Sequence, residues 1–236
     1  KIKQDITNIY NNMPASQVTA QSIATKVLSE YEDIEQGLMV RDFTQTGTEA
    51  IDNVIGGLPE SGLVFILAAP SVGKTTIALQ WCANIAKTVK CSFISLETDS
   101  NTITRMLIGN SSKDLGVTDT RIYLNKIKDN GSKLSLQTAA KVDILKNITL
   151  HEDFSSELTN IIKMIYTDVN NGTKVVFIDY VQLISTNYFG NGNEKLEHIC
   201  KKLQGVSRDL NVPIVVLSQR GRPDDRAAGV QFQMPT

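Results

Sequence analysis

Four short runs rich in apolar residues recur along this chain, and a segment with helical spacing separates each run from the next. The runs occupy residues 63–69, 91–96, 174–178 and 213–218. A strand that is apolar along its whole length needs cover on both faces, so these runs predict buried strands of a mostly parallel sheet. Helices between parallel strands supply the right-handed crossovers that such a sheet requires. The expected fold class is therefore α/β, with helices on both faces of the sheet.

Helices are expected between the runs, at about 74–87, 101–109, 120–146 and 195–210, with a further helix that opens near Ser155 and Ser156. Residues 148–150 are expected to add a short strand. Trp81 lies on the helix that follows the first run, where the core is the simplest place for a large apolar side chain. Together these elements form the main domain, which we expect to span residues 38–219.

The N-terminal part of the chain differs from this domain. Residues 1–15 are polar and Asn-rich, and we expect them to form a flexible tail. Residues 16–37 predict an amphipathic helix at about 18–36, with Ser16 as its cap and Gly37 at its end. The apolar stripe of this helix comprises Ile23, Val27, Leu28, Tyr31 and Ile34. The stripe packs either on its own domain or on a neighbouring subunit, and the connector that follows the helix favours the neighbour.

Composition excludes several classes of protein. With 41% hydrophobic and 21% charged residues, the chain has the proportions of an ordinary globular protein. No window approaches the roughly 18 uninterrupted apolar residues of a membrane helix. The 24 Lys and Arg against 25 Asp and Glu give a net charge of -1, so any nucleic-acid binding must be local. Cys82, Cys91 and Cys200 suit buried thiols of a reducing compartment, and His151 and His198 suit structural or surface roles.

The loop after the first apolar run carries the sharpest chemical signal. It reads Ala69-Pro70-Ser71-Val72-Gly73-Lys74-Thr75-Thr76. Backbone N–H groups of such a loop wrap a β-phosphate, and the following helix adds the partial positive charge of its N-terminus. Lys74 would reach the β- and γ-phosphates, and the Thr75 hydroxyl would bind Mg²⁺. The alternative is a plain turn, but the position between a buried strand and a helix favours the nucleotide interpretation.

Three polar residues follow other apolar runs. Asp179 comes at the end of one strand, where ligands collect in open α/β sheets, and would hold the Mg²⁺ through water. Glu97 follows another strand and could polarise the water that attacks a γ-phosphate. Gln219 ends the last strand, and its amide could donate to the γ-phosphate and distinguish ATP from ADP. The alternatives are a helix N-cap for Asp179, a helix-dipole partner for Glu97 and a solvated strand end for Gln219.

Taken together, these motifs resemble the motor domain of DnaB-type replicative helicases. The matching stretches are Gly-Leu-Pro at 57–59 through Thr76, Ser-Leu-Glu at 95–97, 177–183 and 210–219. The resemblance covers about 46–222, and Ala68 at the first position of the phosphate loop, where the full motif has Gly, is usual in this family. It implies a RecA-like ATPase core and a hexameric ring. It also implies ATP-driven translocation along single-stranded DNA that unwinds the duplex during DNA replication.

The resemblance also assigns roles to single residues. By position, Lys74 and Thr75 are phosphate and Mg²⁺ ligands, and Asp179 is the second metal anchor. Glu97 becomes the general base, and Gln219 couples the γ-phosphate to a DNA-facing loop. The helix within 16–37 resembles the linker helix of the family, which docks on the next subunit. Primase and a helicase loader are implied partners, and the cytoplasm of a bacterial cell or a phage-infected host is the implied location.

Two departures from the family pattern shape our expectations. The family continues after Arg222 with a DNA-contacting loop and an arginine finger, whereas 220–236 are expected to be a truncated or flexible C-terminal loop. Without the finger, this chain is expected to bind ATP but to hydrolyse it weakly. DNA contacts would then come from the loop at 185–193 with Tyr188 and Phe189, and from a basic cluster at the C-terminus. That cluster comprises Arg220, Arg222 and Arg226, and Arg220-Gly221 departs from the usual residues of the family.

The sequence is also compatible with two alternative functions. One is a related RecA-fold ATPase of recombination or regulatory type, which would share the phosphate loop and Asp179 but lack unwinding activity. The Asp-Tyr-Val-Gln-Leu stretch at 179–183 argues against it. The other is an interaction protein whose phosphate loop survives only as a scaffold. The presence of Lys74, Thr75, Glu97 and Asp179 argues against that alternative.

Overall fold

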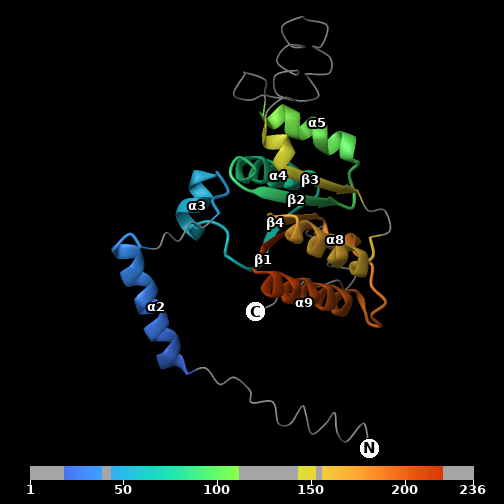
Figure 1. Ribbon diagram of the computed structural model, residues 1–236. Coiled ribbons are helices and arrows are strands. Elements are labelled where there is room, and N and C mark those ends of the chain that lie inside the picture. The colour runs from blue at the N-terminus through green and yellow to red at the C-terminus, as the bar shows by residue number, and fades with distance from the viewer. Residues whose placement is uncertain (1–18, 39–43, 112–142, 153–155, 220–236) are drawn as a thin grey trace, which may run out of the picture. The chain divides into compact units, whose positions relative to one another are not determined.

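The computed structural model describes residues 19–38, 44–111, 143–152 and 156–219, and it divides the chain into units of residues 1–42 and 43–236 (Figure 1). The larger unit contains one sheet. Its strands are β1 (Gly62–Ala68), β2 (Lys90–Ser95), β3 (Ile148–Glu152), β4 (Thr173–Asp179) and β5 (Pro213–Gln219). They lie in the order β1-β5-β4-β2-β3, and every neighbouring pair is parallel. The predicted α/β fold is confirmed.

Helices cover both faces of this sheet, as predicted. Figure 1 shows α4 (Lys74–Ile85) and α5 (Ser100–Ser111) on one face, with α8 (Leu158–Asn170) and α9 (Gly192–Leu210) on the other. Short 3₁₀ turns, η2 (Asp143–Asn147) and η3 (Val181–Leu183), precede β3 and follow β4. Of the helix predicted at 120–146, residues 120–142 lie outside the described part, and the rest belongs to η2 rather than to an α-helix.

The centre of the sheet is buried on both faces. On β4, Val175 and Phe177 pack in an apolar cluster with α4 and α5, whereas Val176 and Ile178 pack in a second cluster with α8 and α9. All four side chains are 0% exposed. Phe177 also stacks on Phe93 of β2, with ring centroids 5.9 Å apart. Residues 175–178 are continuously apolar because helices cover both faces of the strand.

The first strand differs from this pattern. Val64 and Ile66 pack against the cluster that contains α4, but Phe65 and Leu67, which alternate with them, remain 38% and 45% exposed. Among the described strands, β1 pairs with β5 alone and forms one edge of the sheet. The expectation that this run is buried on both faces is therefore wrong for the described part of the molecule.

A seven-residue helix, α3 (Glu49–Ile55), lies where the sequence indicated only a connector with turns. The Asp52 carboxylate accepts hydrogen bonds from the backbone N–H groups of Thr46 and Gly47, each over 2.9 Å. Gly47 has φ +75°, and a Cβ there would lie 2.4 Å from Asn84 Nδ2 of α4. This close approach holds the connector against α4, so tertiary contacts stabilise a helix too short to be evident from the sequence.

The expected core positions near α4 are mostly confirmed. Trp81 is 5% exposed, and its indole N–H donates to Thr48 Oγ1 over 3.0 Å. Cys82 and Cys91 are buried thiols, but Cys200 is only partly buried, and all three are free. Burial raises the pKa of the Cys200 thiol, which keeps it protonated near neutral pH.

Helix α9 begins before its predicted start at 195. Asn191 Oδ1 accepts hydrogen bonds from the backbone N–H groups of Asn193 and Glu194, each over 3.0 Å. The Glu194 carboxylate in turn accepts from the Asn191 backbone N–H over 2.9 Å. This reciprocal capping box satisfies N–H groups that an open helix end would leave without partners. It therefore converts the end of the predicted loop at 185–193 into the first turn of α9.

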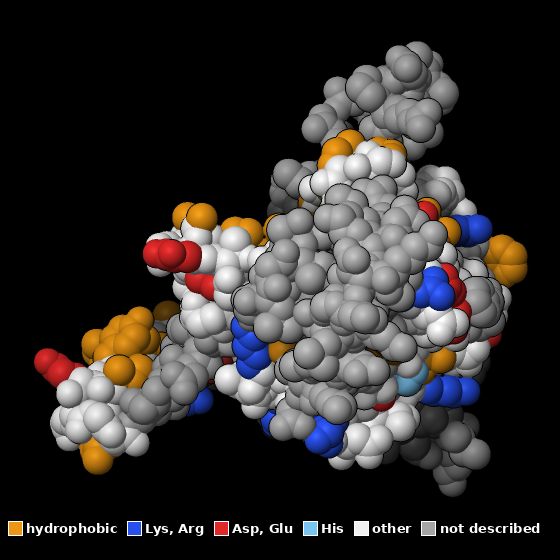
Figure 2. Space-filling view, turned by 90° about the horizontal axis from the view of Figure 1, so that it is seen from above, with side chains coloured by type: hydrophobic (Ala, Val, Ile, Leu, Met, Phe, Trp, Pro, Cys, Tyr) orange, Lys and Arg blue, Asp and Glu red, His pale blue; other side chains and the backbone are white. Residues whose placement is uncertain are grey.

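The smaller unit contains α2 (Ala20–Glu35). Its cap is Thr19, whose Oγ1 accepts from the Ser22 backbone N–H over 3.2 Å, so the helix begins later than predicted from Ser16, which lies outside the described residues. The helix ends at the predicted place, with Gly37 at φ +70°. None of its residues is buried, and Figure 2 shows hydrophobic side chains exposed on it. No helix in the described ranges is long and apolar enough to cross a membrane.

Candidate nucleotide site

The loop at 69–73 joins β1 to α4 at the edge of the sheet where the strands end. Gly73 has φ +94° and Ser71 φ +62°, so the loop turns through the left-handed region twice before α4 begins at Lys74. A Cβ on Gly73 would come no closer than 3.9 Å to Thr76, so conformation rather than space favours glycine there. The loop is open to solvent, with Val72 65% exposed. Such a loop can present backbone N–H groups to an anion.

Three predicted site residues meet beside this loop. The Thr75 hydroxyl donates to Asp179 Oδ2 over 2.6 Å, and Lys74 Nζ lies 3.5 Å from Asp179 Oδ1. Asp179 is 0% exposed, while the Lys74 side chain is 10% exposed. The last residue of β4 and the first turn of α4 are therefore held together by a charged contact, as the shared strand edge predicted.

One oxygen of the Asp179 carboxylate is available to bind a ligand. Its Oδ1 is buried and has no hydrogen-bond partner among the described residues, although the Lys74 charge lies nearby. A buried acceptor without a hydrogen bond is costly unless something else occupies it. Carboxylate and hydroxyl oxygens are the ligands that Mg²⁺ prefers. Asp179 and Thr75 thus fit the cation that the sequence predicted.

Tyr180 completes one wall of the cluster. Lys74 Nζ lies 4.2 Å from the centroid of its ring, within the range of a cation–π contact. Burial raises the pKa of the Tyr180 phenol, and the negative charges of Glu97 and Asp179 raise it further. The phenol therefore stays protonated at neutral pH, and Lys74 is the positive group between the aromatic ring and the carboxylate.

Glu97 and Gln219 lie at the same edge of the sheet. The Leu96 backbone N–H donates to the Asp179 carbonyl oxygen over 2.8 Å, which places Glu97 just beyond the end of β4. Glu97 is exposed, so its carboxylate is open to solvent at this edge. Gln219 pairs with Ala68, the last residue of β1. The predicted residues are thus gathered at one edge.

One residue at this edge was missed by sequence reasoning. Gln182 lies in η3, and its side-chain amide makes three hydrogen bonds to Ser218 and Gln219 at the end of β5. In the sequence, Gln182 stands out only as a member of the stretch at 179–183. That stretch does not indicate a role for Gln182 itself. The partners come from another strand, so spacing alone could not reveal them.

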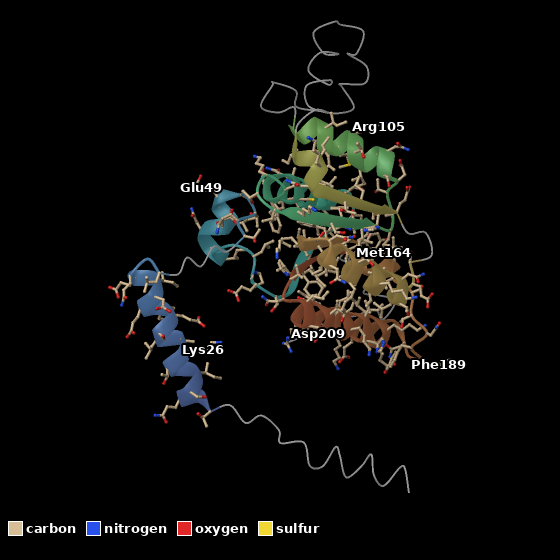
Figure 3. The ribbon with its side chains drawn as sticks, in the orientation of Figure 1. Lys26, Glu49, Arg105, Met164, Phe189 and Asp209 are labelled. Atoms are coloured by element: carbon tan, nitrogen blue, oxygen red, sulfur yellow. The ribbon has the colours of Figure 1, made fainter. Side chains whose placement is uncertain are left out.

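In the loop before α9, one aromatic side chain is packed and the other is exposed. Tyr188 stacks on His198 of α9, with ring centroids 4.5 Å apart, whereas Phe189 is 98% exposed (Figure 3). His198 therefore has a structural contact, as predicted. The predicted basic residues Arg220, Arg222 and Arg226 lie outside the described part of the chain.

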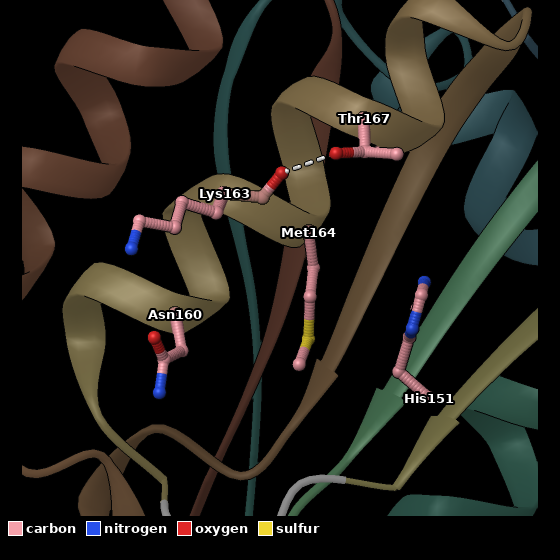
Figure 4. A pocket seen from close by; sticks show the side chains of 5 residues that line it. All are labelled: His151, Asn160, Lys163, Met164 and Thr167. Atoms are coloured by element: carbon pink, nitrogen blue, oxygen red, sulfur yellow. Dashed lines mark hydrogen bonds between the residues drawn. The ribbon is translucent and has the colours of Figure 1, made fainter.

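The other histidine lies beside a separate hollow of about 300 Å³ (Figure 4). This hollow is lined by His151, Asn160, Lys163, Met164 and Thr167, from β3 and α8. His151 Nε2 lies 2.7 Å from Asp168 Oδ2, which also accepts a 2.6 Å hydrogen bond from the Ser92 hydroxyl. His151 thus joins β3 to α8, which fits the predicted structural role. Within the described ranges, no group of three His, Cys, Asp or Glu could hold a metal ion.

Comparison with known proteins identifies relatives of this arrangement. The family described as DnaB-like helicase C terminal domain matches residues 44–229. The chain is 31% identical over 190 residues to the replicative DNA helicase DnaB of Buchnera aphidicola subsp. Baizongia pistaciae, with 75% of this chain and 39% of the relative covered. It is 32% identical over 187 residues to the DnaB of Treponema pallidum, with 78% and 42% covered. The chain thus spans about two fifths of the length of these curated relatives.

Solved structures share the fold. One of them, described as an ATPase domain, superposes with a TM-score of 0.70 at 20% identity, covering 88% of this chain and 74% of that one. A DnaB-like replicative helicase, described together with its interactions with primase, also gives 0.70, at 19% identity and with 95% and 54% covered. At these identities the likeness concerns the fold alone.

Proposed function

Because the chain belongs to the DnaB-like helicase C-terminal domain family, we propose that it is the ATP-driven motor of a replicative helicase. The motor hydrolyses ATP, moves along single-stranded DNA and parts the duplex during replication. The observation that carries this proposal is the cluster of Lys74, Thr75 and Asp179 beside an open phosphate loop. Sequence similarity to replicative helicases supports this function over a recombination-type ATPase without unwinding activity.

The phosphates of ATP bind at the loop 69–73. Backbone N–H groups of the loop and the N-terminus of α4 surround the β-phosphate, and Lys74 reaches the β- and γ-phosphates. In the structure Lys74 contacts Asp179 and Tyr180, so a bound phosphate would take over part of a charge that Asp179 now balances. The left-handed conformation at Gly73 sets the direction of the N–H groups before the ligand arrives.

Thr75 and Asp179 would hold the cation. When bound there, Mg²⁺ would neutralise negative charge on the phosphate oxygens during transfer of the γ-phosphate. Glu97 orients the attacking water, since its carboxylate is exposed at the same edge. The Gln219 side-chain amide donates a hydrogen bond to the γ-phosphate. Gln219 thereby couples the presence or absence of the γ-phosphate to the chain that follows β5.

Parts of the chain outside this cluster would contact DNA and neighbouring subunits. The exposed apolar stripe of α2 supports its role as a linker helix that docks on the next subunit of a hexameric ring, because such a stripe needs cover. Phe189, which is 98% exposed, can stack on a base of single-stranded DNA. Primase and a helicase loader are the proposed protein partners, in the cytoplasm of a bacterial cell or an infected host. The primase contact described for one structural neighbour supports the first of these.

A strand-displacement assay with the full-length protein tests the proposal. We expect ATP-dependent release of a labelled strand from forked DNA, and loss of that release in Glu97→Gln. Glu197→Gln, which changes an exposed carboxylate on α9, is the matched control and should unwind normally. ATP hydrolysis stimulated by single-stranded DNA without strand release would instead support the recombination-type alternative. Absence of ATP hydrolysis by the wild-type protein would refute the motor function.

A further inference from the structure

We infer that Gln182 is a positioning residue that holds the end of β5, and with it Gln219, at a fixed place relative to the metal-binding end of β4. This inference rests on the proposed function, because it concerns how the γ-phosphate would be sensed. The sequence alone indicated no role for Gln182. Its role follows from where the strand pairing stops and from what replaces that pairing.

Strands β4 and β5 separate before they reach the site. Their parallel pairing ends at Ile178 and Val216, although β5 continues to Gln219. On its other side, β5 stays paired with β1 up to Ala68 and Gln219. The last residues of β5 are therefore held by β1, which carries the phosphate loop, but not by the backbone of β4, which carries Asp179.

The side chain of Gln182 fills this gap in the pairing. Its Nε2 donates to the Ser218 hydroxyl over 2.8 Å and to the Gln219 carbonyl oxygen over 3.0 Å. Its Oε1 accepts from the Gln219 backbone N–H over 3.2 Å. Both polar groups of the Gln219 backbone are therefore bound by one side-chain amide, as a neighbouring strand would bind them. The direction in which the Gln219 side chain leaves the backbone is thereby set.

Gln182 is itself well anchored to β4. It lies three residues after Asp179 in η3, beside Val181, which is 0% exposed. The Leu183 backbone N–H donates to the Tyr180 carbonyl oxygen over 3.1 Å and closes the turn. The aromatic loop with Phe189 follows this turn in the chain. Gln182 thus lies between the metal-binding residue, the residue proposed to sense the γ-phosphate and the loop proposed to meet DNA.

This position predicts a specific kinetic effect. Gln182 makes no proposed contact with the phosphates, so its loss should leave ATP affinity nearly unchanged. Misplacement of Gln219 should instead lower the turnover number, and the acceleration by single-stranded DNA should fall most. Residues that orient a functional group without contacting the substrate typically change activity by about 10- to 100-fold.

The test compares ATP affinity and turnover in the full-length protein, with and without single-stranded DNA. Gln182→Glu keeps the shape and one acceptor oxygen but removes both N–H donors, and Gln182→Ala serves if the new carboxylate impairs folding. Gln204→Glu makes the same change at an exposed position of α9 and is the matched control. We expect about tenfold lower DNA-stimulated kcat in either Gln182 variant, ATP Kd within about twofold of wild type, and a normal Gln204→Glu protein.

A double-mutant cycle shows whether the effect passes through Gln219. In a Gln219→Ala background, adding Gln182→Glu should cause no further loss of kcat, because the residue it positions is already gone. Three outcomes would overturn the inference while leaving the motor function intact. They are a double variant whose kcat loss is the product of the two single losses, an unchanged kcat in Gln182→Glu, and a change in ATP Kd alone. A wild-type protein without ATP hydrolysis would refute the proposed function itself, and the inference with it.

Discussion

Strands β1 and β4 have the same length and similar apolar sequences, yet their environments differ. Each has seven residues and leads into the nucleotide site. Six of the seven residues of β4 are buried, whereas β1 has none that is fully buried. β4 lies between β5 and β2, while β1 is an edge strand within the described part of the sheet. An apolar run therefore predicts a strand, but the neighbours of that strand decide its burial.

The difference in burial between β1 and β4 extends to the parts of the site that each strand leads into. β1 leads into an exposed loop whose backbone can surround a ligand, with Val72 65% exposed. β4 ends in Asp179, which is 0% exposed and already bonded to Thr75. One half of the site is thus open to the phosphates, and the other half is fixed before the nucleotide arrives. Such preorganisation by rigid elements is what precise positioning of phosphates requires.

The largest expected effect compares the same substitution in the two strands. Phe177→Ala should lower the free energy of unfolding by about 3–5 kcal/mol, because the ring is fully buried between packed neighbours. Phe65→Ala should cost less, about 1–2 kcal/mol, since that ring is 38% exposed. Urea unfolding of both variants measures the difference. Equal losses would show that β1 is covered as well as β4 in solution.

The next effect concerns the acid at the end of β4. Asp179→Asn should reduce ATP turnover by at least about 100-fold, because the neutral amide binds a cation more weakly and no longer balances the charge of Lys74. Asp209→Asn, an exposed change on α9 (Figure 3), is the control and should match wild type. A steady-state ATPase assay decides the matter. Turnover near wild type in Asp179→Asn would remove Asp179 from the site.

A smaller effect concerns the loop after β1. Gly73→Ala forces a side chain into φ +94°, which should cost about 1 kcal/mol of stability and weaken ATP binding. Val54→Ala, at an exposed position of α3, should change neither quantity appreciably. Thermal unfolding and ATP titration of both variants give the two readouts. If Gly73→Ala binds ATP as tightly as wild type, the loop does not need its left-handed turn.

The smallest effect is visible only at high pH. The pKa of Tyr180 is raised above its ordinary value of 10.0, so the folded protein holds this proton more tightly than the unfolded chain. The free energy of unfolding should therefore fall as pH rises from about 10 through the folded-state pKa, and should be unaffected at neutral pH. Tyr180→Phe should lessen that fall. Denaturation at a series of pH values from 8 upward in ~0.5 steps measures it.

Much of the fold could be read from the sequence because the strongest signals are local. Runs of apolar residues with many β-branched members, as at 175–178 and 214–217, are typical of central strands. Since the carboxyl ends of parallel strands share an edge, the juxtaposition of Lys74, Thr75 and Asp179 also follows from the order of elements. These predictions needed no knowledge of which strand pairs with which.

The predictions that failed depend on long-range contacts or on a missed local motif. The exposure of Phe65 depends on the edge position of β1, and α3 follows a connector that is packed at Gly47 against Asn84 of α4. The partners of Gln182 depend on where β4 and β5 separate. By contrast, the early start of α9 was readable, because Asn191 followed by Glu194 has the spacing of a capping box.

The most direct test of the central claim is calorimetric titration of ATP with Mg²⁺. Three proteins are compared: wild type, Lys74→Ala and Lys87→Ala, the last an exposed lysine just beyond the other end of α4. We predict that wild type and Lys87→Ala bind ATP alike, while folded Lys74→Ala binds at least about 100-fold more weakly, because one charge contact to the phosphates is lost. A wild-type protein that binds no ATP, or a Lys74→Ala protein that binds as tightly as wild type, would contradict the assignment of this loop as a nucleotide site.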